Sequence, residues 1–193
     1  MMRRLADSAS TVEKLRQALL SCLNEREYRD VTIAELSKRA GINRTTFYLF
    51  CGSKDELFID LCRSLVDRWF QPFFDLNIAR NTDREKALFE ELLAWIAQRR
   101  TALTRILNVR TEPFDGFFLL ADEIEKKMAA QSILKAENEK KQKKYDLFIK
   151  IYSVSLASIV KWWLEEGDGF DEDEFHAMIE RLRYKGYYSV LED

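Results

Sequence analysis

The sequence GINRTTFYLF, from Gly41 to Phe50, decides how this chain folds. A helix buried in a core would not carry Arg44 and Thr45, and a fully solvated helix would not carry Phe47 and Phe50. We therefore expect a short amphipathic helix that aromatic side chains pin to its neighbours. Its opposite face would then offer hydroxyls and a guanidinium to a groove in a partner.

The residues before this segment predict a helix-turn-helix. Thr32 precedes Glu35 with the spacing of a capping box, so a short helix should begin there. Gly41 can adopt the left-handed conformation that ends a helix and turns the chain. Asn43 is a favourable N-cap, and the next helix should run from about Asn43 to Leu49. The opening segment would then be the second helix of the motif.

Helix signals recur along the rest of the chain. Ser10, Ser53 and Thr82 are each followed three residues later by glutamate, so each should open a helix. Asp171 repeats this pattern more weakly, and Pro113 should begin a further helix. Glycine and proline number only six and two, which is too few for a sheet with many turns. We therefore predict an all-α chain of about nine helices.

Charge is distributed unevenly along the 193 residues. Residues 1–54 hold ten Lys/Arg against six Asp/Glu, a balance of +4, whereas residues 55–193 hold 21 against 27, a balance of −6. A basic first quarter on an acidic body favours contact between the N-terminal part and a polyanion.

Several classes of protein are disfavoured by composition. His176 is the only histidine, and neither a glycine-rich loop nor paired carboxylates at a recognisable spacing are present, so we expect no catalytic residue, cofactor or metal site. Cys22, Cys51 and Cys62 are scattered and odd in number, as in a reducing cytoplasm. No apolar run reaches the roughly 18 to 20 residues of a membrane span. We therefore expect a cytoplasmic protein without a membrane partner.

The polar residues around the expected second helix suit DNA recognition. Arg44 can donate two hydrogen bonds to guanine O6 and N7. Thr45 and Thr46 can contact a thymine methyl group or a phosphate. Tyr48 can donate to a phosphate oxygen, and Lys54 lies at a helix N-terminus, which itself attracts anions.

The sequence TIAELSKRAGINRTTFYLFCGSKDELF, from Thr32 to Phe58, resembles the DNA-binding signature of the TetR family of bacterial transcriptional regulators. The matching positions are Thr32, Ala40, Gly41, Phe47, Tyr48, Phe50, Ser53, Lys54 and Leu57. The resemblance implies a homodimeric regulator, expected to be a repressor, that binds a palindromic operator in double-stranded DNA. We expect the DNA-binding residues to be Thr32, Asn43, Arg44, Thr45, Thr46, Tyr48 and Lys54. The DNA-binding domain should occupy residues 1–54, and a helical regulatory and dimerisation domain residues 55–193.

Two apolar helices near the C-terminus could complete the core or meet a second copy of the chain, and the residues alone leave both readings open. The stretch SIVKWWLEEG, 158–167, resembles the C-terminal domain of a TetR subgroup common in Gram-positive bacteria. TetR relatives form a four-helix dimer interface from two C-terminal helices of each subunit, so the resemblance favours dimerisation. The expected interface residues are Phe148, Tyr152, Leu156, Ile159, Trp163, Phe175, Ile179 and Leu182.

Aromatic residues in the middle of the chain could line a ligand pocket or simply form core. The candidate pocket residues are Phe70, Phe74, Trp95, Phe114, Phe117, Phe118 and Tyr152. A small apolar effector bound there would release the DNA. The alternative is a helix-turn-helix adaptor or coactivator controlled by a protein partner instead of an effector pocket.

Overall fold

The computed structural model describes residues 2–79, 82–130, 137–182 and 186; within these ranges, the side chains of residues 2–9, 70–79, 82, 83, 85 and 180 are not described. The described ranges form nine α-helices and one short 3-10 helix, with no strand among them, which confirms the all-α prediction. The helices are α1 (Met2–Glu25), α2 (Ile33–Arg39), α3 (Arg44–Phe50), α4 (Lys54–Ala79), α5 (Thr82–Ala97), α6 (Arg100–Asn108), α7 (Gly116–Ala130), α8 (Glu139–Glu166) and α9 (Glu172–Arg181), and the 3-10 helix is η1 (Tyr28–Asp30).

Some of the predicted helix starts are confirmed by the structure, and others are wrong. Thr32 and Asp171 each cap a helix by accepting a hydrogen bond from the backbone N–H three residues later. Ser10 does not start a helix, because α1 already begins at Met2. The preceding residues include leucine, alanine and arginine, which propagate a helix well, so an internal Ser-x-x-Glu pattern does not interrupt it.

Pro113 was also wrong as a helix start, since α7 begins at Gly116. Asp115 provides the cap, and its Oδ1 accepts from the N–H groups of Phe117 at 2.9 Å and Phe118 at 3.2 Å. Gly116 is required for the close approach of α6, because a Cβ there would lie 1.9 Å from the carbonyl oxygen of Ile106.

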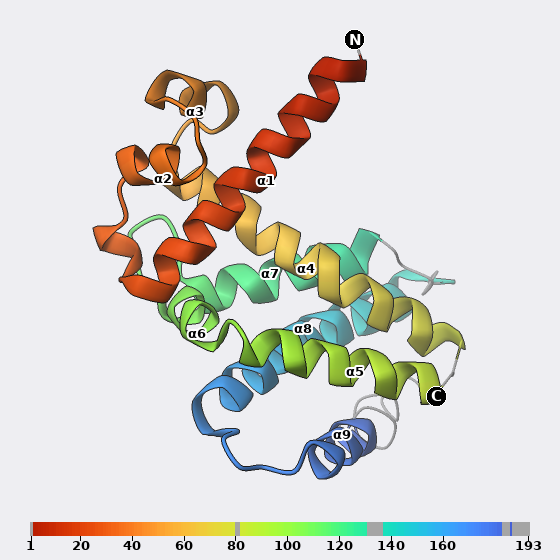
Figure 1. The fold of residues 1–193 in the computed structure, drawn as a ribbon. Helices are drawn as coiled ribbons and strands as arrows, with labels where there is room; N and C mark the ends of the chain where they lie inside the picture. Colours follow the sequence, from red (N-terminus) through yellow and green to blue (C-terminus); the bar gives the residue numbers. More distant parts are fainter. Residues whose placement is uncertain (1, 80–81, 131–136, 183–185, 187–193) are drawn as a thin grey trace.

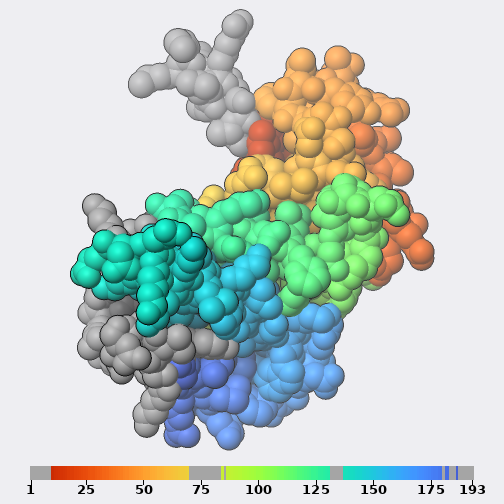
Figure 2. Space-filling model, turned by 180° about the vertical axis from the view of Figure 1, so that it is seen from behind, coloured from red at the N-terminus to blue at the C-terminus, as the bar shows by residue number. Residues whose placement is uncertain are grey.

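The first three helices and the start of α4 form one end of the molecule (Figure 1). Their shared core contains Leu19, Leu36, Phe47 and Phe58, all fully buried. Figure 2 shows this end, in orange and red, opposite α8 and α9, in blue, with the green helices between them.

Helix α4 connects the two ends. It packs against α1 near its start and against α5 and α7 further along. The apolar core is continuous from Leu15 of α1 through Ile106 of α6 to Leu164 of α8. The expected division of the chain at residue 54 stays a prediction.

Candidate functional site

Two side-chain caps and one glycine build the turn between α2 and α3. Thr32 Oγ1 accepts from the N–H of Glu35 at 3.2 Å and fixes the start of α2. Gly41 adopts a φ of +68°, a conformation that residues with a Cβ rarely accept. Asn43 Oδ1 then accepts from the N–H of Thr46 at 2.7 Å and from its hydroxyl at 3.0 Å. The turn thus depends on short-range interactions that the sequence already encodes.

Helix α3 is amphipathic in the way the sequence predicted. Phe47 is 0% exposed and packs into the core that α1, α2 and α4 share. Arg44, Thr45 and Tyr48 lie exposed on the opposite face. The Arg44 guanidinium lies 5.9 Å from the centre of the Tyr48 ring, so these two side chains form one polar surface.

The other predicted contact residues have partly different surroundings. Thr32 and Asn43 are exposed, but the side-chain oxygen of each is used for capping. Thr46 is half-buried and donates its hydroxyl to Asn43. These three residues therefore shape the motif, and DNA contacts by them stay predictions.

Lys54 has an internal role that sequence reasoning did not anticipate. Its Nζ donates to the carbonyl oxygens of Tyr28 at 2.8 Å and Val31 at 2.9 Å, and it lies 4.3 Å from the centre of the Tyr28 ring. Desolvation by burial lowers the pKa of Lys54. An ammonium has three donors, so one remains for a phosphate, and that contact stays a prediction.

Sequence reasoning also missed Leu49, which is 77% exposed on α3. It follows Thr45 by one helical turn, so the two side chains are neighbours on the exposed face. The signal was present in the sequence, since Phe47 and Phe50 cannot face the core together with Leu49 on so short a helix.

Ion pairs neutralise much of the positive charge around the motif. Arg16 pairs with Asp60, Arg26 with Glu35, and Arg39 with Glu25. Arg44 has no carboxylate partner in the part of the chain that the structure describes. Its positive charge is therefore available to a partner that binds the exposed face of α3.

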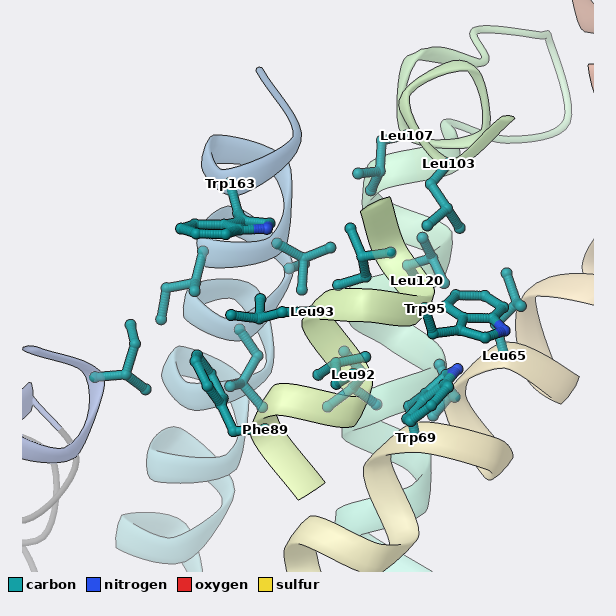
Figure 3. A pocket seen from close by; sticks show the side chains of 18 of the residues that line it. Leu65, Trp69, Phe89, Leu92, Leu93, Trp95, Leu103, Leu107, Leu120 and Trp163 are labelled. Carbon is teal, nitrogen blue, oxygen red and sulfur yellow. The ribbon is translucent and has the colours of Figure 1, made fainter. Parts of the chain in front are cut away.

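A second candidate site is a cavity of about 200 Å³ lined by residues of helices α4 to α9 (Figure 3). Trp95 and Tyr152, two of the predicted pocket residues, line it. The rest of the lining is almost entirely aliphatic and aromatic, including Leu65, Val66, Trp69, Phe89, Leu92, Leu93, Leu120, Leu156 and Trp163.

Three of the other predicted pocket residues, Phe114, Phe117 and Phe118, do not line this cavity. Phe114 stacks on Phe58, with ring centres 5.0 Å apart, in the core beneath the helix-turn-helix. Phe117 packs against that same core, and Phe118 is 58% exposed. For Phe114 and Phe117, helical spacing predicted an inward face but could not tell which of two interiors the side chain would enter. The side chains of Phe70 and Phe74 lie outside the described residues.

Comparison with known families identifies the motif. Residues 15–61, from α1 into α4, match the model of the bacterial regulatory proteins of the tetR family. The chain belongs to the TetR family. It is accordingly a transcriptional regulator with a DNA-binding helix-turn-helix, and members of this family are generally not enzymes.

Solved TetR structures share the fold over nearly the whole chain. A TetR transcriptional regulator from Rhodococcus sp. RHA1 has a TM-score of 0.59 at 14% identity and covers 96% of this chain and 97% of its own. FadR from Thermus thermophilus, a TetR-family repressor solved with lauroyl-CoA, has a TM-score of 0.52 at 18% sequence identity, and the match covers 91% of this chain and 94% of its own. NalD from Pseudomonas aeruginosa, the secondary repressor of the MexAB-OprM multidrug efflux pump, has a TM-score of 0.50 at 17% sequence identity, and the match covers 93% of this chain and 97% of its own. No curated protein sequence matches this chain.

In this TetR protein, the apolar residues that α8 and α9 expose differ from the residues predicted to form the dimer interface. Phe148, Tyr152, Phe175 and Ile179 are buried within the chain itself. They fill the spaces between α8 or α9 and the helices next to them, so their side chains are not available to a second copy. Leu156, Ile159 and Trp163 are half-buried, and Leu182 is exposed. The exposed large apolar residues of these helices are Leu147, Ile151, Trp162, Met178 and Leu182.

Helix α8 is long and apolar enough to cross a membrane, the one such helix in the described ranges. A core helix of a soluble protein passes the same test. Here α8 packs against α6 and α7 and buries Phe148, Ile149 and Leu164, so one side of the helix belongs to the core.

Proposed function

We propose that this protein is a cytoplasmic repressor that binds a palindromic operator as a homodimer, through α3, and releases it when a small apolar effector binds. The DNA-binding part of this proposal rests on how α3 packs against the rest of the protein. The buried Phe47 fixes the helix, while Arg44, Thr45 and Tyr48 remain exposed together. This arrangement suits insertion into a major groove.

Roles on α3 follow from chemistry. Arg44 is proposed to read guanine, because its guanidinium matches O6 and N7 and has no carboxylate partner among the described residues. Tyr48 is proposed to donate to a phosphate oxygen, and Lys54 is proposed to donate its remaining hydrogen to a phosphate as well. Phosphate contacts position the helix and base contacts provide sequence preference.

The dimer is proposed to form through the exposed apolar side of α8 and α9. On α8, Leu147, Ile151 and Trp162 are spaced by four and eleven residues, which places them along one face. The hydroxyls of Ser155 and Ser158, between them, donate to carbonyls of their own helix at 2.8 and 2.9 Å. This face can therefore be buried at little cost in unmet hydrogen bonds.

The effector is proposed to bind in the cavity between α4 and α9. The FadR relative was solved with lauroyl-CoA and NalD is a repressor of an efflux pump, which supports an apolar effector here. Helix α4 begins next to α3 and contributes Leu65, Val66 and Trp69 to the cavity wall. An effector can release DNA through this helix only if it prefers a conformation that binds DNA poorly.

The direct test is binding of the purified protein to the promoter region next to its own gene, compared with random duplex of equal length, by fluorescence anisotropy over a salt series. Arg44→Ala should cost about 1 to 3 kcal/mol on the operator and little on random DNA. Arg29→Ala is the matched control, because Arg29 is an exposed arginine on η1, outside α3.

Two results would contradict this proposal. An unchanged ratio of operator to random affinity in Arg44→Ala would remove Arg44 from base reading. Absence of binding to any duplex at low salt would reject the DNA-binding assignment and favour an adaptor or coactivator.

A further inference from the structure

One wall of the apolar cavity contains a buried polar atom that finds no partner among the described residues. Trp69 of α4 lines the cavity, and its Nε1–H is buried and makes no hydrogen bond within the described part of the chain. A buried donor without an acceptor destabilises the folded state. A ligand oxygen at this wall would satisfy it.

Two positive charges lie next to the tryptophans of this wall. Trp69 and Trp95 lie side by side where α4 meets α5, with ring centres 5.2 Å apart (Figure 3). The Arg68 guanidinium lies 5.3 Å from the Trp69 ring centre and 5.8 Å from that of Trp95. The Arg99 guanidinium lies 4.8 Å from the Trp95 ring centre. Both cations thus border the indole pair that closes this part of the cavity.

Neither guanidinium is neutralised by a carboxylate of the described chain. Arg99 donates to the carbonyl of Trp95 at 3.4 Å and to the side chain of Gln98 at 3.2 Å. Arg68 is exposed and has no hydrogen-bond or ion-pair partner among the described residues. By contrast, Arg63, one and a half turns earlier on α4, pairs with Glu123 of α7. The positive potential at the two indoles is therefore available to an anion.

We infer that the cavity binds a small amphipathic carboxylic acid, with its apolar body among the leucines and its carboxylate at Trp69, Arg68 and Arg99. The inference rests on the proposed effector function and specifies its ligand class. A carboxylate accepts hydrogen bonds from both an indole N–H and guanidinium groups, and a neutral oil would leave all three unused.

The cavity volume limits the apolar body. An apolar cavity of about 150 Å³ holds benzene. In proportion, the volume of about 200 Å³ here corresponds to roughly eight carbon atoms. Octanoate is therefore the probe of choice, with octanol as a neutral molecule of equal length.

The test is isothermal titration calorimetry of the full chain with octanoate, octanol and octanoyl-CoA. Octanoate should bind about tenfold or more tightly than octanol, as expected for hydrogen bonds to a charged group. Arg68→Gln and Arg99→Gln should each reduce this preference. In the double variant, the ratio of octanoate affinity to octanol affinity should be close to one. Trp69→Phe keeps a ring in place but removes the donor, so it should weaken octanoate several-fold and leave octanol unchanged. Arg29→Gln, which removes the same charge on η1, should retain the preference.

Equal binding of octanoate and octanol to the wild-type protein would overturn the inference. Binding of octanoyl-CoA alone would overturn it too, because the recognised group would then be the thioester or nucleotide. If neither octanoate nor octanol binds while the operator is still bound, this inference fails and the DNA-binding function stands. Loss of operator binding itself would instead reject the proposed function.

Discussion

At the scale of single residues, the exposed face of α3 combines polar and apolar chemistry. Arg44 and Tyr48 lie one helical turn apart, and Thr45 and Leu49 form a second pair beside them. Arginine discriminates guanine, whereas a threonine methyl and a leucine side chain suit the thymine methyl group. The face therefore contains chemistry for both kinds of base pair.

Leu49 should contribute to operator preference through thymine methyl groups. Leu49→Ala is expected to weaken operator binding by roughly 1 kcal/mol, the value of one or two buried methyl groups. Replacing operator thymines by uracil removes only those methyl groups, so the effect of Leu49→Ala should disappear on the uracil operator. Anisotropy titrations of both proteins on both duplexes measure this. Phe118→Ala, at another exposed apolar residue, is the control, and an equal loss on both duplexes would contradict the assignment.

At the scale of elements, polar contacts tie α4 both to the loop after α1 and to α7. Tyr28 donates its hydroxyl to Asp55, and Lys54 binds the carbonyls of Tyr28 and Val31, so the start of α4 holds the loop that follows α1. Further along, Arg63 donates to the buried Glu123 of α7 at 3.2 Å. A shift of α4 must therefore change polar contacts at both places.

The contact between α4 and α7 should make stability depend on pH. Burial alone would raise the pKa of Glu123, but hydrogen bonds from Lys126 and Arg63 outweigh it and lower that pKa. A lowered folded-state pKa contributes stability above the ordinary glutamate pKa of about 4.3, and this stability is lost as pH falls through the folded-state pKa. Glu123→Gln should therefore lower the melting temperature at pH 7 and have a smaller effect below about pH 4.

Thermal unfolding of wild type and variant from pH 7 to pH 3 tests this prediction. Glu112→Gln is the control, because Glu112 is exposed and has no ion pair among the described residues. A melting-temperature difference for Glu123→Gln that stays constant over this range would show that its carboxylate contributes no charge-dependent stability.

At the scale of the whole molecule, the apolar faces of α8 and α9 point in two directions. One side fills the protomer core with Phe148 and Phe175, and the other exposes Leu147, Ile151 and Trp162. A homodimer with two-fold symmetry would bury the exposed side of both copies at once. The spacing between the two α3 helices would then be set by this distant contact.

Ile151→Glu should convert the proposed dimer to monomer, because each interface would bury two unpaired carboxylates at a cost of several kcal/mol. Since Ile151 is exposed in the protomer, the monomer should remain folded. Light scattering gives the mass, and circular dichroism checks the helix content. Phe118→Glu, at an exposed residue of α7, should stay dimeric. A wild-type mass of one 22.8 kDa chain at tens of micromolar would contradict the dimer itself.

The sequence by itself determined the features that depend on neighbours close along the chain. The caps at Thr32, Asn43 and Asp171 and the left-handed turn at Gly41 involve atoms within a few residues, so their patterns predicted α2, α3 and α9. The amphipathic pattern of α3 likewise placed Phe47 inside and Arg44 outside.

The tertiary structure alone decided which partner each apolar face receives. Helical spacing shows that Phe114 and Tyr152 face inward, yet only the packed helices show that one lies under the helix-turn-helix and the other beside the cavity. Phe148 and Phe175 proved to be core, since broad apolar faces contact several helices and the sequence does not state which neighbour covers each side. Lys54 turned inward for the same reason, because its carbonyl partners, Tyr28 and Val31, lie more than twenty residues away along the chain. Contacts between distant segments arise only when the whole chain packs, so local pattern could not predict them.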